Sequence, residues 1–307
     1  MRIIVTGANG FVGSHLLALL EERRIDSVAV VRSEESDISR IKDFKHTHIV
    51  YCPMEKIGKL ASLIPDRDID ACVHLAWSGA NGKARGDYGL QLANVKWSLD
   101  LCRALQEMKV RRFVGIGSLA ENDIAAYIDG DGATPNAVSC YGIAKTTAGH
   151  FTKVFCTQAG IEYIWCKLAN LYGPGDSTNN FINFASKIML SGGRAAFTEG
   201  RQMHDFVYID DIVRGILAVI ESGKTNTGYY LGSGKARQLK EYIYAIREAI
   251  NPDIELHLGE IPYNGVFLPK EEFDCQKLFE DTGYLPEVPF EDGVLKTLAW
   301  LKSGWRG

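Results

Sequence analysis

Short apolar runs alternate with longer amphipathic stretches through the first half of the chain. Residues 3–5 form one such run, which ends at a Thr-Gly pair, and from position 10 onward apolar residues recur at spacings of three and four. The first pattern is typical of a buried strand and the second of an amphipathic helix. Further apolar runs predict strands at 27–31, 48–51, 70–75, 112–116 and 163–168. This alternation predicts an α/β fold built on a parallel sheet.

The helical pattern is longest between residues 87 and 108, where it is apolar on two sides. The residues expected to face the core are Leu92, Val95, Leu99 and Leu105. The residues of the second apolar side are Leu90, Trp97 and Leu101. Because both sides are apolar, this helix needs two packing partners.

Three glycines directly follow the first predicted strand. Gly7 permits a tight turn, Gly10 lets the backbone approach a pyrophosphate, and Gly13 lets the new helix pack closely on the strand. The N-terminus of this helix offers unpaired N–H groups and a partial positive charge to phosphate oxygens. Glycine-rich turns without a ligand are common, but the position between the first strand and an amphipathic helix favours dinucleotide binding.

The end of the second predicted strand carries a basic residue. Arg32 lies nineteen residues after Gly13, about where such folds place the residue that contacts the adenosine ribose. An acidic residue there would bind the 2′-hydroxyl of NAD, whereas an arginine pairs with the 2′-phosphate of NADP. Arg32 therefore favours NADP, with NAD as the alternative cofactor. The other interpretation of Arg32 is a solvated side chain at a strand end.

A tyrosine and a lysine lie four residues apart in the helical stretch 139–151. This spacing places the side chains of Tyr141 and Lys145 on one face of the helix. A free phenol has a pKa of about 10, and we expect the ammonium of Lys145, together with an oxidised nicotinamide, to lower that pKa. Ser118, just after the fifth predicted strand, is placed to hydrogen-bond a reacting oxygen. The three residues predict proton transfer by Tyr141 at a carbonyl or hydroxyl group.

The composition excludes several classes of function. The chain has 307 residues, of which 46% are hydrophobic and 23% charged, and its formal net charge is −4. Such a chain lacks the basic face that broad nucleic-acid binding needs, and no run approaches the roughly 18 apolar residues of a membrane helix. Seven cysteines without a CxxC pair indicate neither a disulfide framework nor a zinc site. We expect a cytoplasmic protein that binds no metal.

Several motifs resemble those of the extended short-chain dehydrogenase/reductases, a family that includes nucleotide-sugar epimerases, dehydratases and 4-ketoreductases. GANGFVG at 7–13 is similar to the opening of that family, and HLAW at 74–77 to its HLA segment. Three further motifs extend the resemblance over nearly the whole chain. They are ANLYGPG at 169–175, GRQMHDFVYIDDIVRGI at 200–216 and FDCQKLFEDTGYLP at 273–286.

The resemblance implies a doubly wound Rossmann domain over residues 1–170, to which residues 200–225 return, and a smaller C-terminal α/β domain over 171–307 that mainly binds the substrate. The catalytic residues it implies are Ser118, Tyr141 and Lys145. The cofactor contacts it implies are Gly7, Asn9, Gly10, Phe11, Val12, Gly13, Arg32, Leu75, Ala76, Asn94, Tyr141 and Lys145. The substrate contacts it implies are Ser118, Asn170, Asn180, Phe181 and His204, the last at the position of a phosphate-binding arginine.

The stretch after Ser118 distinguishes branches of this family. The 4,6-dehydratases have an acidic pair directly after the serine or threonine, whereas this chain has Leu119 and Ala120. GIGSLAEN at 115–122 resembles the GSxAEYG motif of deoxysugar 4-ketoreductases. The resemblance therefore implies an NADP(H)-dependent reductase of a nucleotide-linked 4-keto sugar. An NAD-dependent 4-epimerase is the alternative, and a dehydratase or a non-catalytic cofactor-binding protein is less favoured.

The same resemblance implies an assembly and two substrate loops. In the family, the helix that corresponds to 87–108 and the tyrosine-bearing helix form a four-helix dimer interface, so we expect a homodimer. The loops 77–85 and 175–180 are expected to shape the substrate pocket. Asp210 and Asp211 are expected to start and cap the helix that follows them rather than to bind a metal.

Overall fold

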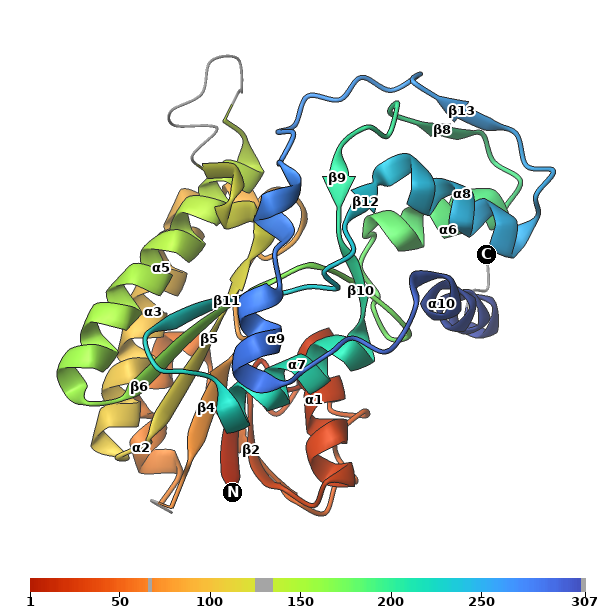
Figure 1. Cartoon of the computed structure of the whole chain (residues 1–307). Coiled ribbons are helices and arrows are strands. Elements are labelled where there is room, and N and C mark those ends of the chain that lie inside the picture. Colours follow the sequence, from red (N-terminus) through yellow and green to blue (C-terminus); the bar gives the residue numbers. More distant parts are fainter. Residues whose placement is uncertain (66–67, 125–134, 305–307) are drawn as a thin grey trace.

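Seven parallel strands form the main sheet of the computed structural model, which describes residues 1–65, 68–124 and 135–304 (Figure 1). The strands are β1 Arg2–Thr6, β2 Asp26–Val31, β3 Thr47–Tyr51, β4 Ala71–His74, β5 Arg112–Ser118, β6 Glu162–Leu168 and β11 Thr227–Leu231. Their order across the sheet is β11-β6-β5-β4-β1-β2-β3. This order changes direction between β1 and β4, which is where doubly wound folds bind ligands. The predicted fold is confirmed, and β11 is a strand that the sequence analysis did not assign.

Helices cover both faces of this sheet (Figure 1). The helices of the first face are α1 Phe11–Glu22 and α7 Ile209–Ser222, and those of the second are α2 Leu60–Leu63, α3 Tyr88–Glu107 and α5 Ala137–Ala159. Successive strand side chains point to opposite faces, so Ile3 and Val5 belong to the first core and Ile4 to the second. None of the described helices is both long and apolar enough to cross a bilayer.

The turn between β1 and α1 is crowded by backbone. Gly7 has a φ of +66°, and a β-carbon there would lie 2.8 Å from the backbone nitrogen of Ala76. A β-carbon on Gly13 would collide with the carbonyl oxygen of Gly7. Side chains cannot be accommodated at such distances, and L-residues rarely adopt that φ. The turn itself therefore requires glycine at these two positions.

The inward side of α3 differs from the predicted one. Leu92, expected in the core, is 67% exposed, and Leu101, expected on the second apolar side, is fully buried. The buried positions include Gln91, Asn94 and Ser98, whose polar groups form hydrogen bonds within the chain. Val95 and Leu105 are buried as expected. Because part of the inward side is polar, the positions of the apolar residues alone predicted only part of the buried side of this helix.

The second half of the chain adds a smaller lobe beside the carboxyl ends of the strands (Figure 1). Its strands pair as β7 Asn170–Tyr172 with β10 Phe206–Tyr208, β8 Ala195–Phe197 with β13 Leu256–Leu258, and β9 Met203–His204 with β12 Arg237–Gln238. The later helices are α6 Phe181–Leu190, α8 Leu239–Ile250, α9 Gln276–Thr282 and α10 Phe290–Gly304. Short 3-10 helices lie at η1 Met54–Lys59, η2 Gly82–Gly86, η3 Leu119–Glu121 and η4 Lys270–Phe273.

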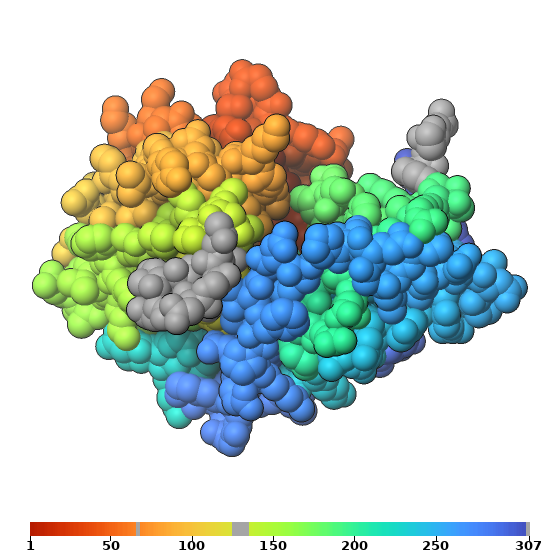
Figure 2. All heavy atoms as spheres, turned by 90° about the horizontal axis from the view of Figure 1, so that it is seen from above, coloured from red at the N-terminus to blue at the C-terminus, as the bar shows by residue number. Residues whose placement is uncertain are grey.

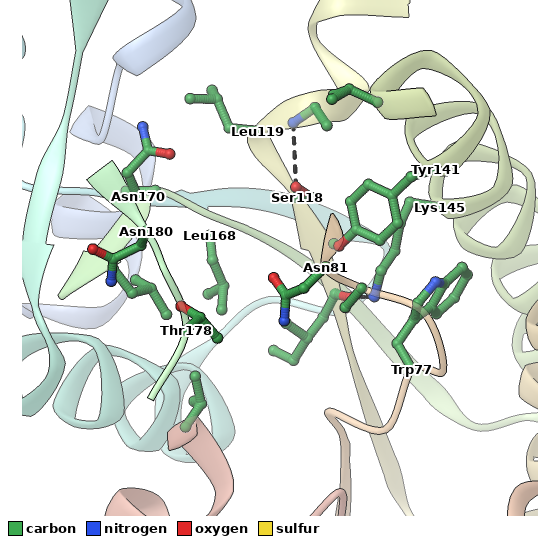
Figure 3. Close-up of a pocket in the computed structure, with 18 of the residues that line it drawn as sticks. Trp77, Asn81, Ser118, Leu119, Tyr141, Lys145, Leu168, Asn170, Thr178 and Asn180 are labelled. Carbon is green, nitrogen blue, oxygen red and sulfur yellow. Dashed lines mark hydrogen bonds between the residues drawn. The ribbon is translucent and has the colours of Figure 1, made fainter. Parts of the chain in front are cut away.

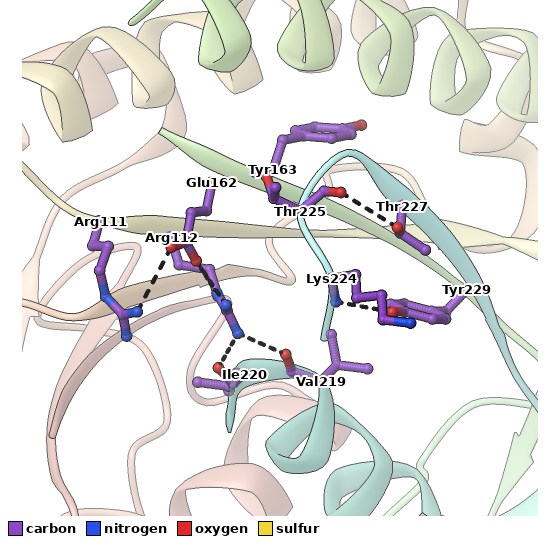
Figure 4. Close-up of polar contacts among 10 residues, drawn as sticks. All are labelled: Arg111, Arg112, Glu162, Tyr163, Val219, Ile220, Lys224, Thr225, Thr227 and Tyr229. Atoms are coloured by element: carbon purple, nitrogen blue, oxygen red, sulfur yellow. Dashed lines mark hydrogen bonds and ion pairs between the residues drawn. The ribbon is translucent and has the colours of Figure 1, made fainter. Parts of the chain in front are cut away.

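A buried arginine fixes α7 to the main sheet (Figure 4). Arg112, at the start of β5, donates from Nε to the Glu162 carboxylate of β6 at 2.7 Å. Its guanidinium also donates to the carbonyl oxygens of Val219, at 3.1 Å, and Ile220 in the last turn of α7. A cation satisfies unpaired carbonyls at a helix C-terminus well. α7, which belongs to the second half of the chain, is therefore held against the strands formed by the first half.

Asp211 does not cap α7 as expected. The N-cap residue is Tyr208, and no side chain caps this helix. The buried Asp211 carboxylate instead accepts hydrogen bonds from the backbone N–H groups of Glu287, at 2.9 Å, and Val288, at 3.0 Å. A buried carboxylate needs such donors, so Asp211 fixes the segment before α10 to α7. Asp210 lies in the first turn, where a negative charge complements the helix dipole.

Candidate active site

A pocket of about 550 Å³ opens where the carboxyl ends of the central strands meet the second half of the chain. Seen from above, the first half (red to yellow-green) and the second half (green to blue) meet across this face of the molecule (Figure 2). The expected site residues that line the pocket are Gly7, Gly10, Phe11, Val12, Gly13, Leu75, Ser118, Tyr141, Lys145, Asn170, Asn180, Phe181 and His204. The fold thus gathers residues that are far apart in the sequence into one cavity.

Four expected cofactor residues lie outside the lining of this pocket. Asn94 is buried in α3, where its side-chain amide exchanges hydrogen bonds with the backbone of Ser78 and holds the loop after β4. Ala76 belongs to the same loop, and the side chain of Asn9 donates to the backbone of the connection after β2. Arg32 is exposed at the end of β2. These positions support the walls of the pocket or flank it.

Ser118 ends β5 and begins η3. Its Oγ accepts a hydrogen bond from the backbone N–H of Ala120 at 3.2 Å, and the Glu121 carboxylate accepts one from the backbone N–H of Ser118 at 2.7 Å. This reciprocal pattern is a capping box, which fixes the serine rotamer. The Ser118 hydroxyl also acts to lower the pKa of the Tyr141 phenol, and both side chains point into the pocket (Figure 3). Two hydroxyl groups therefore converge at the end of β5.

Lys145 carries a buried ammonium group. Its Nζ donates to the carbonyl oxygen of Ile116 at 2.7 Å and lies 4.0 Å from the centroid of the Trp77 ring. Burial lowers the pKa of Lys145 to about 7, although the Glu121 carboxylate acts in the opposite direction. Figure 3 shows Lys145 between Tyr141 and Trp77. Its position is thus fixed by a strand carbonyl and an aromatic face.

The phenol of Tyr141 has a raised pKa, because burial disfavours the phenolate. Arg85 and the Ser118 hydroxyl act to lower the pKa of Tyr141, and Glu121 acts to raise it. The guanidinium carbon of Arg85 lies 4.9 Å from the centroid of the phenol ring, compared with 6.0 Å for Nζ of Lys145. The expected lowering of this pKa by Lys145 is therefore not found in the protein by itself, since desolvation is the larger effect.

A buried carboxylate lies behind the two hydroxyls. The indole N–H of Trp165 donates to both oxygens of Glu121, at 3.2 and 3.1 Å. Burial raises the pKa of Glu121, against the hydrogen bond from Ser118 and the charges of Lys167 and Lys145. A β-carbon on Gly117 would collide with this carboxylate, so the glycine before the serine makes room for it.

The opposite wall of the pocket is polar and carries one carboxylate, that of Asp176, which accepts a hydrogen bond from Nδ2 of Asn180 at 2.6 Å. Nδ2 of Asn170 lies 3.2 Å from Nδ1 of His204. With the amide nitrogen as donor, Nδ1 is the acceptor and the ring proton lies on Nε2. Burial lowers the pKa of His204 to about 4, so the ring is neutral at pH 7. Asn180 caps α6 by accepting from the backbone N–H of Asn183 at 2.8 Å.

The pocket also contains residues that the motifs did not identify. Trp77, Asn81 and Arg85 come from the loop 77–85, which was expected to shape the pocket. Asp123 lines it as well, and burial raises the pKa of this carboxyl to about 6. The segment before η4 contributes Tyr263, Val266 and Leu268. No pattern in the sequence indicated which side chains of the loop 77–85 point inward.

The glycine turn fits the phosphates of a dinucleotide. Gly10 is the N-cap of α1, and no side chain caps this helix, so the N–H groups of its first turn are available to phosphate oxygens. Gly10 to Gly13 line the same pocket as Tyr141 and Lys145. Within the described ranges, no group of three or more His, Cys, Asp or Glu side chains could hold a metal ion.

A doubly wound sheet with a glycine turn beside a tyrosine–lysine pair is typical of dinucleotide-dependent oxidoreductases. The model of the NAD dependent epimerase/dehydratase family matches residues 3–232. The chain therefore belongs to this enzyme family, and the resemblance drawn from the motifs is confirmed.

The individual relatives have low sequence identity to this chain, and most are nearly the same length as it. The CDP-abequose synthase of Salmonella typhimurium is 25% identical over 81% of this chain and 81% of its own length. A putative UDP-glucose 4-epimerase of Methanocaldococcus jannaschii is 24% identical over 99% of both chains. The crystal structure of the Thermotoga maritima UDP-glucose 4-epimerase with UDP-glucose is similar with a TM-score of 0.82, at 23% identity and 99% coverage of both chains. A Bordetella bronchiseptica enzyme in complex with NADH has a TM-score of 0.80 at 21% identity, covering 98% of this chain and 92% of that one.

The buried ammonium predicts a pH-dependent stability. The pKa of Lys145 is about 7 in the folded chain and about 10.4 for a free lysine. Between these values the unfolded chain binds more protons than the folded one, so this group makes stability rise with pH. In Lys145→Met this rise is absent. The free energy of unfolding of the wild type relative to Lys145→Met should therefore increase from about pH 7 to about pH 9.5.

Urea unfolding at a series of pH values measures this difference. Lys153→Met, at an exposed position of the same helix, is the control and should leave the pH dependence as in the wild type. The prediction would be contradicted if the free energy of unfolding of the wild type, relative to that of Lys145→Met, stayed constant over this pH range or fell as the pH rises.

Proposed function

We propose that the protein is an NADP(H)-dependent reductase that converts the C4 carbonyl of a nucleotide-linked 4-keto-6-deoxy sugar into a hydroxyl group. The observation that carries this proposal is the convergence of the Ser118 and Tyr141 hydroxyls in the pocket that also contains the glycine turn. Two hydroxyl donors suit a carbonyl oxygen that becomes an alcohol. Leu119 and Ala120 stand where a dehydratase has its acidic pair, which argues against elimination of water.

The residues of the chain supply the proton and the polarisation. When bound, the reduced cofactor supplies a hydride for the carbonyl carbon. Tyr141 donates its hydroxyl proton to the carbonyl oxygen, and Ser118 donates a hydrogen bond to the same oxygen. Lys145 binds ribose hydroxyls of the cofactor and stabilises the resulting phenolate. One hydride and one proton are thereby added to the carbonyl, and solvent restores the proton of Tyr141.

Residues 1–170, with the returning segment 200–225, bind the cofactor in this proposal, and residues 171–307 mainly bind the substrate. Asn170, Asn180 and Phe181 contact the nucleotide sugar, and His204 donates a neutral hydrogen bond from Nε2 to its diphosphate. The names of the CDP-abequose synthase and the UDP-glucose 4-epimerase support a nucleotide sugar as the substrate class. All seven cysteines are free thiols, which suits the cytoplasm as the compartment.

Isotope transfer separates this function from the alternative, an NAD-dependent 4-epimerase. Purified protein is incubated with NADPH deuterated at the transferable position and with 4-keto-6-deoxyhexoses linked to CDP, dTDP or UDP. A reductase consumes one NADPH for each alcohol formed and places the deuterium at C4. Protein isolated with bound NAD that interconverts UDP-glucose and its C4 epimer, with neither NADPH consumption nor deuterium uptake, would replace the reductase with the epimerase.

The variant Tyr141→Phe tests the assigned proton donor in the same assay. Loss of the phenolic hydroxyl should lower turnover by about 100-fold or more. The affinity for NADPH, measured by fluorescence titration, should stay near that of the wild type, because the phenyl ring still fills the same space. Turnover close to the wild-type rate would refute the role of Tyr141.

Arg32 is the basis for the proposed preference for NADP. Its side chain is exposed at the end of β2, where it can pair with a 2′-phosphate. Arg32→Asp should lower the ratio of NADPH to NADH affinity by about tenfold or more, since a charge-assisted pair is replaced by repulsion. Arg23→Asp, at the exposed C-cap of α1, controls for the change in net charge. An unchanged ratio in Arg32→Asp would remove this residue from the cofactor site.

A homodimer is the proposed assembly. α3 and α5 pack side by side on one face of the sheet, and their outer surfaces present exposed apolar side chains. These are Leu92, Ile143, Phe151 and Val154, which are 67%, 46%, 55% and 57% exposed. Exposed apolar side chains on two neighbouring helices favour association, and in a symmetric dimer this face would pair with its own copy.

Light scattering after size exclusion tests the dimer. The double variant Leu92→Glu, Phe151→Glu should be monomeric, because it would bury four carboxylates without partners at one interface. Leu295→Glu, at a position of α10 that is 55% exposed, should stay dimeric. A wild-type protein that is monomeric at micromolar concentration would refute the proposal.

A further inference from the structure

The loop between β4 and α3 places a guanidinium group on the catalytic tyrosine. Arg85 is in η2, and its CZ atom lies 4.9 Å from the centroid of the Tyr141 ring. Nε of Arg85 donates to the carbonyl oxygen of Ala80 at 2.6 Å, which closes the loop on itself. Both Arg85 and Tyr141 line the pocket. The cation therefore contacts the tyrosine within the pocket.

A buried glutamine holds this loop in place. Gln91, in the first turns of α3, is 1% exposed. Its Nε2 donates to the carbonyl oxygens of Gly79 and Ala84, both at 3.0 Å, and its Oε1 accepts from the indole N–H of Trp77 at 2.9 Å. These three side-chain hydrogen bonds thus all go to the segment that carries Arg85. The loop is an ordered bracket, which we define as residues 77–85 and Gln91.

The same bracket contacts both members of the tyrosine–lysine pair. The Trp77 ring packs edge-on against Tyr141, with centroids 6.1 Å apart, and its face receives the ammonium of Lys145 at 4.0 Å. Arg85 adds its own cation to the phenol. Because guanidinium groups keep their charge at every relevant pH, Arg85 supplies a permanent positive charge there. Lys145 is held closer to Trp77 than to the phenol.

We infer that Arg85 is a positioning residue for Tyr141. The guanidinium of Arg85, held by the bracket, stabilises the phenolate that forms when Tyr141 gives up its proton. This inference deepens the proposed function, on which it rests for the identity of the reaction. The other charged groups that face the phenol are Lys145 on α5 and Glu121 on η3, and Asp123 lines the same pocket. Lys145 belongs to the helix that carries the tyrosine–lysine pair, whereas Arg85 comes from the loop between β4 and α3.

The titration of Tyr141 can be followed without any sugar. Full-length protein containing tyrosine labelled with carbon-13 at Cζ is titrated with and without NADP, and the Tyr141 signal is assigned by its loss in Tyr141→Phe. Removing a unit charge whose centre lies 4.9 Å from the ring centroid of a buried phenol should raise the pKa of that phenol by about one to two pH units. Arg85→Met and Arg85→Gln should both show this rise. Arg85→Lys, which keeps the charge, should restore most of the wild-type value.

Lys83→Met is the matched control, because Lys83 is an exposed cation in the same 3-10 helix that lies outside the pocket lining. It should leave the Tyr141 titration unchanged. An unchanged Tyr141 pKa in Arg85→Met and Arg85→Gln, or an equal rise in Lys83→Met, would overturn the inference. If one neutral variant fails to fold by circular dichroism, the other still decides. If the protein reduces none of the keto sugars, the proposed function is refuted, but the titration still tests whether Arg85 lowers the pKa of Tyr141.

Discussion

Burial of one ammonium group constrains the whole active site. Lys145 can be held at 4% exposure only because the Ile116 carbonyl, the face of Trp77 and the charge of Glu121 compensate for lost water. These partners belong to β5, to the loop after β4 and to η3. α5 must therefore approach all three elements closely, and Gly142 permits this, since a β-carbon there would lie 2.5 Å from the carbonyl oxygen of Ala120.

Burial also affects Tyr141, the second member of the pair. Desolvation raises the pKa of Tyr141, so the phenol carries its proton at neutral pH, as a donor to a carbonyl oxygen must. Once the proton has left, the phenolate needs nearby cations, and the guanidinium of Arg85 and the ammonium of Lys145 lie over or beside the ring. Tyr141 is thus protonated at first, and nearby cations stabilise its phenolate afterwards. This sequence suits the proposed reduction, because reduction of a carbonyl consumes one proton in each turnover.

The first six strands, the glycine turn and the tyrosine–lysine pair could be predicted because each follows from local spacing. The buried side of α3 could be predicted only in part, because it includes Gln91 and Asn94, whose suitability for the interior depends on partners in the loop after β4. Arg85 was missed for the same reason, since its position over Tyr141 is produced by hydrogen bonds within that loop. Sequence patterns report which residues prefer the interior, but not which polar groups find partners there.

The distribution of charge in the pocket constrains how a nucleotide sugar would be held. Among the described residues that line it, Arg85 and Lys145 are the Lys or Arg side chains, and both lie at the tyrosine end. The opposite wall offers Asn180, at the N-terminus of α6, and a neutral His204, with Asp176 nearby. A diphosphate bound there would therefore be met by hydrogen-bond donors and a helix dipole rather than by an ion pair. Neutral donors bind a diphosphate more weakly than arginine does, so more of the specificity for the substrate would come from the sugar itself, at the tyrosine end.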